Sequence, residues 1–219
     1  MMMLPEIGHY ALILAMMFAL ALAVLPMVGY LQRNAILLVT AKPLTYLMAT
    51  LTCTSFVILA IAFAQDDFSI LYVSQHSNSL LPIWYKISAV WGGHEGSLLL
   101  WITILCIWAA TLAYKSDSLP NSTGPVVLSV LGIVATGFLA FILFTSSPFI
   151  RLLPDTPADG VDLNPLLQDI GLIVHPPMLY MGYVGFSVAF AFAIAALITG
   201  NLNASWARWA RPWTNVSWA

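Results

Sequence analysis

His175 is the residue of this sequence whose type and setting are best suited to binding a metal. It stands directly before Pro176 and Pro177, at the head of an uncharged apolar stretch. Because proline restricts the preceding residue to extended backbone and favours the first helical position, a helix is predicted to begin at Pro176 or Pro177, with His175 as its N-cap. The helix dipole and partial burial would both favour a neutral ring with a metal-binding lone pair. The alternative is an interfacial histidine that only hydrogen-bonds the chain end.

A second group with possible chemistry is the run Trp91, Gly92, Gly93, His94 and Glu95. The two glycines permit close approach of the backbone, and the two ionisable residues stand at the start of an apolar span. Such a run can shape a binding surface or supply a proton relay. It can equally be a simple helix entry, with the acid near the positive end of the helix and the tryptophan as an interface anchor.

The elements that position these residues are predicted to be membrane-spanning helices. The chain has 219 residues, of which 61% are hydrophobic and 7% charged, with a mean hydropathy of +0.92. Soluble globular proteins have about 25% charged residues, so this composition indicates an all-α, polytopic membrane protein. Five apolar stretches within a single membrane domain, 1–219, are long enough to cross a bilayer: 7–28, 44–64, 97–114, 126–144 and 177–198.

Two loops, 65–96 and 145–176, are longer than simple turns. Apolar residues recur at helical spacing from Ile83 to Trp91, which predicts a short interfacial helix in the first loop. The aspartates of the second loop lack the spacing of a calcium site. We interpret the second loop as solvated, with an amphipathic segment, 166–174, leading to His175. A docking surface for a basic partner is the alternative.

Motifs that the sequence lacks exclude several classes of protein. Cys53 and Cys106 lie in separate spans, with no CxxC or CxxCH motif, so they are predicted to be small core residues. The chain is therefore not expected to carry covalently attached haem. No basic run suggests a nucleic-acid partner.

The basic residues predict the orientation of the spans. Five of the seven lie in three segments on one side: 29–43, 115–125 and 199–219. By the positive-inside rule these segments, including the C-terminal tail, are cytoplasmic, and the N-terminus is periplasmic. All four histidines then fall on the outer side: His9, His76, His94 and His175.

Two long motifs give the chain a resemblance to a known family. Residues 91–101 read Trp-Gly-Gly-His-Glu-Gly-Ser-Leu-Leu-Leu-Trp, and residues 163–180 read Leu-Asn-Pro-Leu-Leu-Gln-Asp-Ile-Gly-Leu-Ile-Val-His-Pro-Pro-Met-Leu-Tyr. With the opening Pro5 to His9 and the order of the spans, they closely resemble the N-terminal part of the CcmF family of cytochrome c-type biogenesis proteins, which includes an NrfE branch. The resemblance covers essentially the whole chain but only about the first third of a family member.

The resemblance implies a haem-binding subunit of a haem lyase in the bacterial inner membrane. In that system, haem delivered by the chaperone CcmE is attached to the CxxCH cysteines of apocytochrome c at the outer face, with a CcmH-type thiol subunit as a further partner. The family's ligand for the incoming haem corresponds to His175, with Pro176, Pro177 and Tyr180 in support. The run 91–95 would shape the adjoining outer surface.

The same resemblance limits what the chain is expected to do alone. The ligands of the family's permanent b-type haem, its second outer histidine and its tryptophan-rich segment correspond to positions beyond residue 219. We therefore expect transient haem binding through His175 as the only metal contact, no catalytic residue, and completion by a C-terminal portion or a companion chain.

Two other functions stay open from the residues alone. A membrane transporter or proton-translocating subunit would use His94 and Glu95 as a relay, and a structural membrane anchor would need no histidine. A relay requires ionisable groups at depth within the spans, and the five predicted spans hold almost none.

Overall fold

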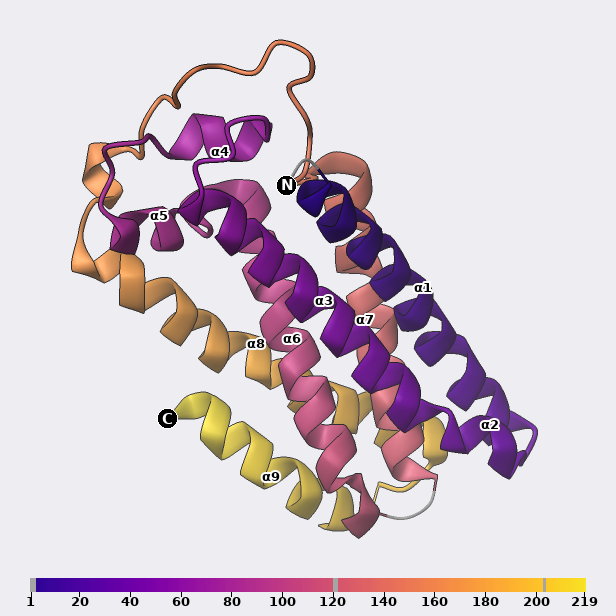
Figure 1. Ribbon diagram of the computed structural model, residues 1–219. Coiled ribbons are helices and arrows are strands. Elements are labelled where there is room, and N and C mark those ends of the chain that lie inside the picture. The colour runs from indigo at the N-terminus through magenta and orange to yellow at the C-terminus, as the bar shows by residue number, and fades with distance from the viewer. Residues whose placement is uncertain (1–2, 120–121, 203) are drawn as a thin grey trace.

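The computed structural model describes residues 3–119, 122–202 and 204–219, and this part of the chain is built from helices (Figure 1). They are α1 (Leu4–Leu31), α2 (Ala35–Val39), α3 (Ala41–Ala64), α4 (Leu71–His76), α5 (Ile83–Ala89), α6 (His94–Lys115), α7 (Thr123–Thr145), α8 (Ile170–Thr199) and α9 (Ala204–Trp218). Five helices are long and apolar enough to cross a membrane, with α2 and α3 counted as one. The predicted all-α polytopic fold is therefore confirmed, and each predicted span falls inside one of these helices.

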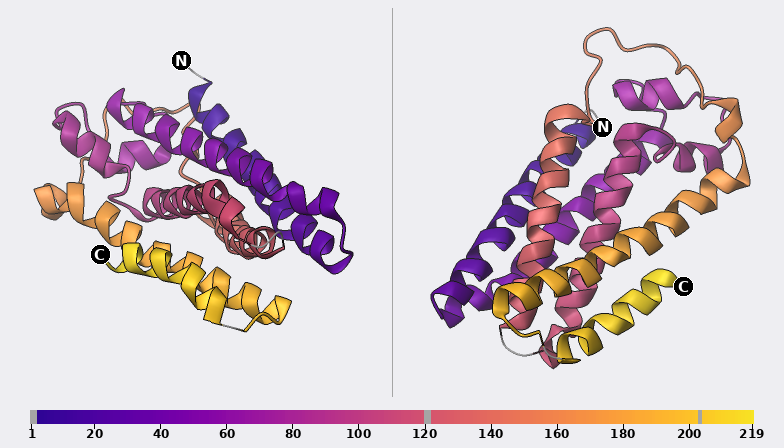
Figure 2. Two further views of the ribbon diagram at one scale, coloured as in Figure 1. Left: turned by 90° about the horizontal axis from the view of Figure 1, so that it is seen from below. Right: turned by 180° about the vertical axis from the view of Figure 1, so that it is seen from behind.

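The spanning helices lie in three layers (Figure 2). α1 and α3 pack on one side, α6 and α7 lie in the middle, and α8 with α9 covers the other side. Small residues permit close contact between α1 and α7, because a Cβ added to Gly132 would lie 2.8 Å from the backbone nitrogen of Ala23. The Ser129 hydroxyl donates to the Ala23 carbonyl at 2.5 Å. Such contacts through small residues are typical of membrane helices.

The connections alternate between the two ends of the bundle (Figure 1). The N-terminus, α4, α5 and the long segment between α7 and α8 lie at one end, which we call the N-terminal end. α2 and the C-terminal ends of α6 and α8 lie at the other. Both long loops that carry the predicted site residues therefore meet at the N-terminal end.

The predicted start of the last helix, at Pro176 or Pro177, is wrong. α8 begins at Ile170, and its N-cap is Asp169, whose carboxylate accepts a hydrogen bond from the Gly171 amide at 2.6 Å. His175 is therefore the sixth residue of α8 and not an N-cap. An aspartate N-cap stabilises a helix start, and here it prevails over the local preference of proline for the first helical position.

α8 is longer than a helix needs to be to cross a membrane. With 30 residues, α8 is about 45 Å long, whereas a hydrocarbon core is about 30 Å thick. The helix also runs obliquely across α6 and α7 (Figure 2). The first turns of α8, which include His175, therefore lie at the N-terminal end of the bundle, where the surrounding segments are loops and short helices.

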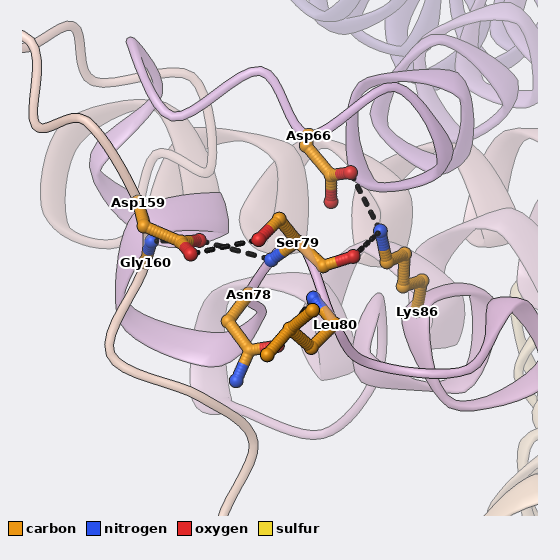
Figure 3. Close-up of polar contacts among 7 residues, drawn as sticks. All are labelled: Asp66, Asn78, Ser79, Leu80, Lys86, Asp159 and Gly160. Atoms are coloured by element: carbon orange, nitrogen blue, oxygen red, sulfur yellow. Dashed lines mark hydrogen bonds and ion pairs between the residues drawn. The ribbon is translucent and has the colours of Figure 1, made fainter.

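The short helix predicted within 83–91 is present as α5, whereas α4 has no counterpart among the predicted elements. α5 turns its charge inward: the Lys86 ammonium pairs with Asp66 at 2.5 Å and donates to the Ser79 carbonyl at 3.2 Å (Figure 3). Ile83 and Trp84 are exposed instead. An apolar outward face of this kind is what a helix at a membrane interface presents.

Asp159 fastens the long segment before α8 to the loop before α5. Its carboxylate accepts from the Ser79 amide at 2.9 Å, from the Ser79 hydroxyl at 2.7 Å and from the Gly160 amide at 2.8 Å (Figure 3). These hydrogen bonds, with Ser79 the largest cause, favour the charged form and lower the pKa of Asp159 below its usual value. The attachment of this segment therefore depends on an ionised carboxylate.

We expect Asp159→Asn to loosen this segment at neutral pH. Because the pKa of Asp159 is lowered by folding, its contribution in the unmodified chain is complete above the unfolded value of about 4 and is lost as the pH falls through the lower folded value. Limited proteolysis of residues 154–162 between pH 3 and pH 7 measures this. Asp155→Asn is the control, because Asp155 is exposed and makes no hydrogen bond to another described residue. Equal cleavage of the two variants at every pH would contradict the prediction.

Candidate functional site

Hydrogen bonds join the two sequence motifs, and one of them involves Trp91. The indole N–H of Trp91 donates to the backbone carbonyl of Leu172 in α8 at 2.8 Å. In a regular helix that carbonyl would accept from the N–H of residue 176, but Pro176 has none. Trp91 therefore supplies the donor that Pro176 lacks and compensates for the hydrogen bond lost at the first of the two prolines.

Tyr72 of α4 holds the turn that carries Trp91. Its hydroxyl accepts from the Gly93 amide at 3.0 Å and donates to the Val90 carbonyl at 3.0 Å. Burial raises the pKa of the Tyr72 hydroxyl above its usual range, so it remains a neutral donor. A Cβ at Gly93 would lie 2.5 Å from Nε2 of His76, and a Cβ at Gly96 would overlap the Val90 carbonyl oxygen. The glycines of this run are therefore required for close approach.

An aromatic hollow lies beside this turn, between α6, α7 and α8. Its volume is about 510 Å³, and it is lined by Trp91, Gly92, Gly93, His94, Ser97, Leu98, Trp101, Phe138, Tyr180 and Tyr183. The Tyr180 hydroxyl lies 2.6 Å from the Ser97 hydroxyl, which joins α8 to α6. The Trp101 and Phe138 rings stack with centroids 3.7 Å apart. Four of the five residues of the run 91–95 thus share one hollow with Tyr180.

His175 faces away from that hollow. Its side chain is exposed, so the predicted partial burial is wrong, and it makes no hydrogen bond or ion pair to another described residue. The reason is that α8 starts earlier, which turns residue 175 to the outer surface of the helix. Met178 and Leu179 follow it on the same helical face and are 68% and 49% exposed. A free imidazole therefore stands at the head of an exposed apolar face.

The structure connects the two predicted groups but does not merge them into one pocket. Trp91 and Tyr180 hold the first half of α8 through hydrogen bonds. Residues 91–94 line the aromatic hollow, whereas His175 is not among its lining residues. Among the described residues, no group of three or more histidine, cysteine or acidic side chains is placed to hold a metal ion. Any metal bound at His175 would therefore need its other ligands from elsewhere, as the iron of a haem has from its porphyrin.

His94 and Glu95 occupy the first turn of α6, at the edge of the bundle. His94 is exposed, and Glu95 stands at the helix N-terminus, where an acid is favoured by the dipole. The ionisable carboxylates, histidines, lysines and arginines of the described spanning helices lie in their terminal turns, apart from His9 and His175, each the sixth residue of its helix. A relay through the membrane has no chain of groups to use in this part of the molecule.

Comparison with known proteins identifies the family. Residues 91–219, which begin at Trp91 and include α6 to α9, match the family described as Cytochrome C assembly protein. The chain belongs to this family. It is 57% identical over 217 residues to the cytochrome c-type biogenesis protein CcmF of Pseudomonas aeruginosa and 53% identical over 216 residues to CcmF of Haemophilus influenzae, in each case over 99% of this chain.

A solved structure agrees with this membership of the cytochrome c assembly family. The protein named cytochrome c heme lyase CcmF superposes with a TM-score of 0.83 at 27% identity, over 98% of this chain. The chain spans about a third of the length of the CcmF relatives it matches, 33% in each case. The predicted resemblance is therefore confirmed for this portion.

Three contributors to the site lie outside the sequence predictions: Tyr72, Ser97 and the Leu172 carbonyl. Tyr72 and Ser97 act through contacts between helices, which no local pattern reveals. The sequence does indicate that the Leu172 carbonyl lacks its usual donor if residue 176 is helical, because every proline inside a helix frees the carbonyl four residues before it. What supplies the missing donor is visible only in three dimensions.

Proposed function

We propose that this chain is a haem-binding membrane subunit of a cytochrome c maturation system. The observation that supports the proposal is His175: an exposed imidazole with no hydrogen-bond partner among the described residues, followed by the exposed apolar residues Met178 and Leu179. Haem has an iron that accepts an axial imidazole and a largely apolar ring. The donor and the apolar surface that haem requires are thus next to each other.

Five consecutive residues of α8, 175–179, have a role in this proposal. His175 would bind the iron of the incoming haem, which is the substrate, from one side. Pro176 and Pro177 would stiffen the turn that follows, and Met178 and Leu179 would lie against the ring. Haem supplies the vinyl groups to which the cysteine thiols of apocytochrome c add, so the chain needs no nucleophile of its own.

Membership of the family supports a setting for this reaction. We place the chain in the bacterial inner membrane, with the N-terminus in the periplasm and the segment 199–219 in the cytoplasm, as the distribution of basic residues favours. Haem would arrive from CcmE, apocytochrome c would be the acceptor, and a CcmH-type subunit would present its thiols. The remaining two thirds of the relatives' length, on the same or a companion chain, would complete the lyase.

His175→Ala is expected to abolish covalent attachment of haem to apocytochrome c in cells, with the protein still inserted in the membrane. The reason is that no other described side chain offers a free imidazole at this surface of α8. His94→Ala is the matched control and should retain maturation. Staining of membrane fractions for covalently bound haem measures the outcome. Normal maturation in His175→Ala would exclude the proposed ligand, and a selective loss in His94→Ala would favour the proton-relay function instead.

A further inference from the structure

Trp91 is joined to the turn that carries His175, although the two side chains do not meet. From its indole the connection runs to the Leu172 carbonyl, which lies three residues before His175 on the same helical face. This bond spans 81 positions of sequence. A displacement of Leu172 would therefore move His175 with it.

The Leu172 carbonyl depends on Trp91 because its usual helical donor, the N–H of residue 176, is missing. Pro176 removes the N–H that would bond to it, and a carbonyl left without a donor weakens the helix around it. The Trp91 indole replaces that donor at 2.8 Å. Asp169 caps the start of α8, and Tyr180 is hydrogen-bonded to Ser97 further along the helix. The Trp91 bond to Leu172 lies between these two contacts.

The turn that presents Trp91 is itself fixed. Tyr72 is 3% exposed and bonds to both sides of the turn, at Val90 and Gly93. A Cβ at Gly92 would lie 3.1 Å from Leu163, just ahead of the segment that leads to α8. The indole is therefore presented by a rigid support and not by a mobile loop.

We infer that Trp91 is a positioning residue for His175, acting through the carbonyl that Pro176 leaves free. Within the run 91–95, the tryptophan then holds the helix of the proposed haem ligand, by hydrogen bonding as well as by packing. The link to haem rests on the proposed function, whereas the link between Trp91 and α8 does not.

A double-mutant cycle tests the inference, because Pro176→Ala restores the missing N–H. In the unmodified background, Trp91→Phe should speed amide hydrogen exchange in residues 171–180 about fivefold, the effect of one lost neutral hydrogen bond. In the Pro176→Ala background, the same change should have an effect of less than about twofold. The full chain in lipid nanodiscs, digested after labelling and measured by mass spectrometry, gives these rates.

Trp84→Phe is the matched control. Trp84 is 70% exposed on α5 and donates no hydrogen bond to another described residue, so its replacement should leave exchange in residues 171–180 unchanged. Equal effects of Trp91→Phe in both backgrounds would show that the ring acts by packing alone and would overturn the inference. No effect in either background would overturn it as well.

Titration with ferric haem separates this inference from the proposed function. Trp91→Phe should weaken haem binding about fivefold, the same factor as in exchange, and Pro176→Ala should suppress that effect. If His175→Ala leaves haem binding unchanged, the proposed function fails, whereas the exchange cycle still decides the role of Trp91. If the exchange cycle is purely additive, Trp91 is not a positioning residue, whatever His175 binds.

Discussion

Replacing His175 by glycine is expected to weaken ferric haem binding to this chain by at least about 100-fold. Loss of outer-shell partners of a metal ligand typically costs 10- to 100-fold in affinity, and loss of the ligand itself should cost no less. The exposed face around Met178 and Leu179 would still attract the apolar ring, so weak binding would persist without an axial imidazole. Absorbance titration of the chain in nanodiscs measures the affinity and reports the ligand through the haem spectrum.

His94→Gly provides the control for this titration. His94 is also exposed and at the N-terminal end of the bundle, but it lies at the start of α6, beside the aromatic hollow. We expect its loss to leave haem affinity within about twofold of the unmodified chain, because His175 supplies the iron ligand. A larger loss of affinity in His94→Gly than in His175→Gly would contradict the prediction, because it would place the iron ligand on α6 and not on α8.

Gly96→Ala is expected to destabilise the fold by on the order of 3 kcal/mol. The added Cβ would overlap the carbonyl oxygen of Val90 and lie 2.7 Å from the Tyr72 hydroxyl. These two groups hydrogen-bond to each other, so the methyl group cannot be accommodated without breaking the bond that supports the turn. The midpoint of thermal unfolding in detergent should fall by about 6 °C or more.

Gly137→Ala is the matched control for this stability measurement. Gly137 is an exposed position of α7, and nothing lies within 4 Å of a Cβ placed there. Alanine is favoured over glycine inside a helix by about 0.5 to 1 kcal/mol, so the midpoint should stay the same or rise. If the two variants unfold at the same temperature, the crowding around Gly96 has no energetic consequence.

The spanning helices could be predicted from the sequence because a membrane imposes a simple requirement. A stretch such as 126–144 must be apolar and long enough to cross, and both properties are local. The short helix around Ile83 was predictable for the same reason, from its repeating apolar residues. Its inward-pointing Lys86 was not, because the partner Asp66 is 20 residues away in sequence.

The start of α8 shows where a local rule fails. Proline at position 176 favours a helix beginning there, but Asp169 offers a cap seven residues earlier and Trp91 supplies the donor that the helix then lacks. The first of these is a short-range signal, and the second is a tertiary contact. Together they turn His175 outward, which is why its exposure could not be predicted from its neighbours.

The most direct test of His175 as the haem ligand is chemical rescue of His175→Gly by free imidazole. Small imidazole can occupy the space of the missing side chain and bind the iron in its place. The glycine variant with ferric haem should show the absorption spectrum of the unmodified chain only when imidazole is added. A spectrum and affinity equal to those of the unmodified chain without any imidazole would contradict the assignment of His175.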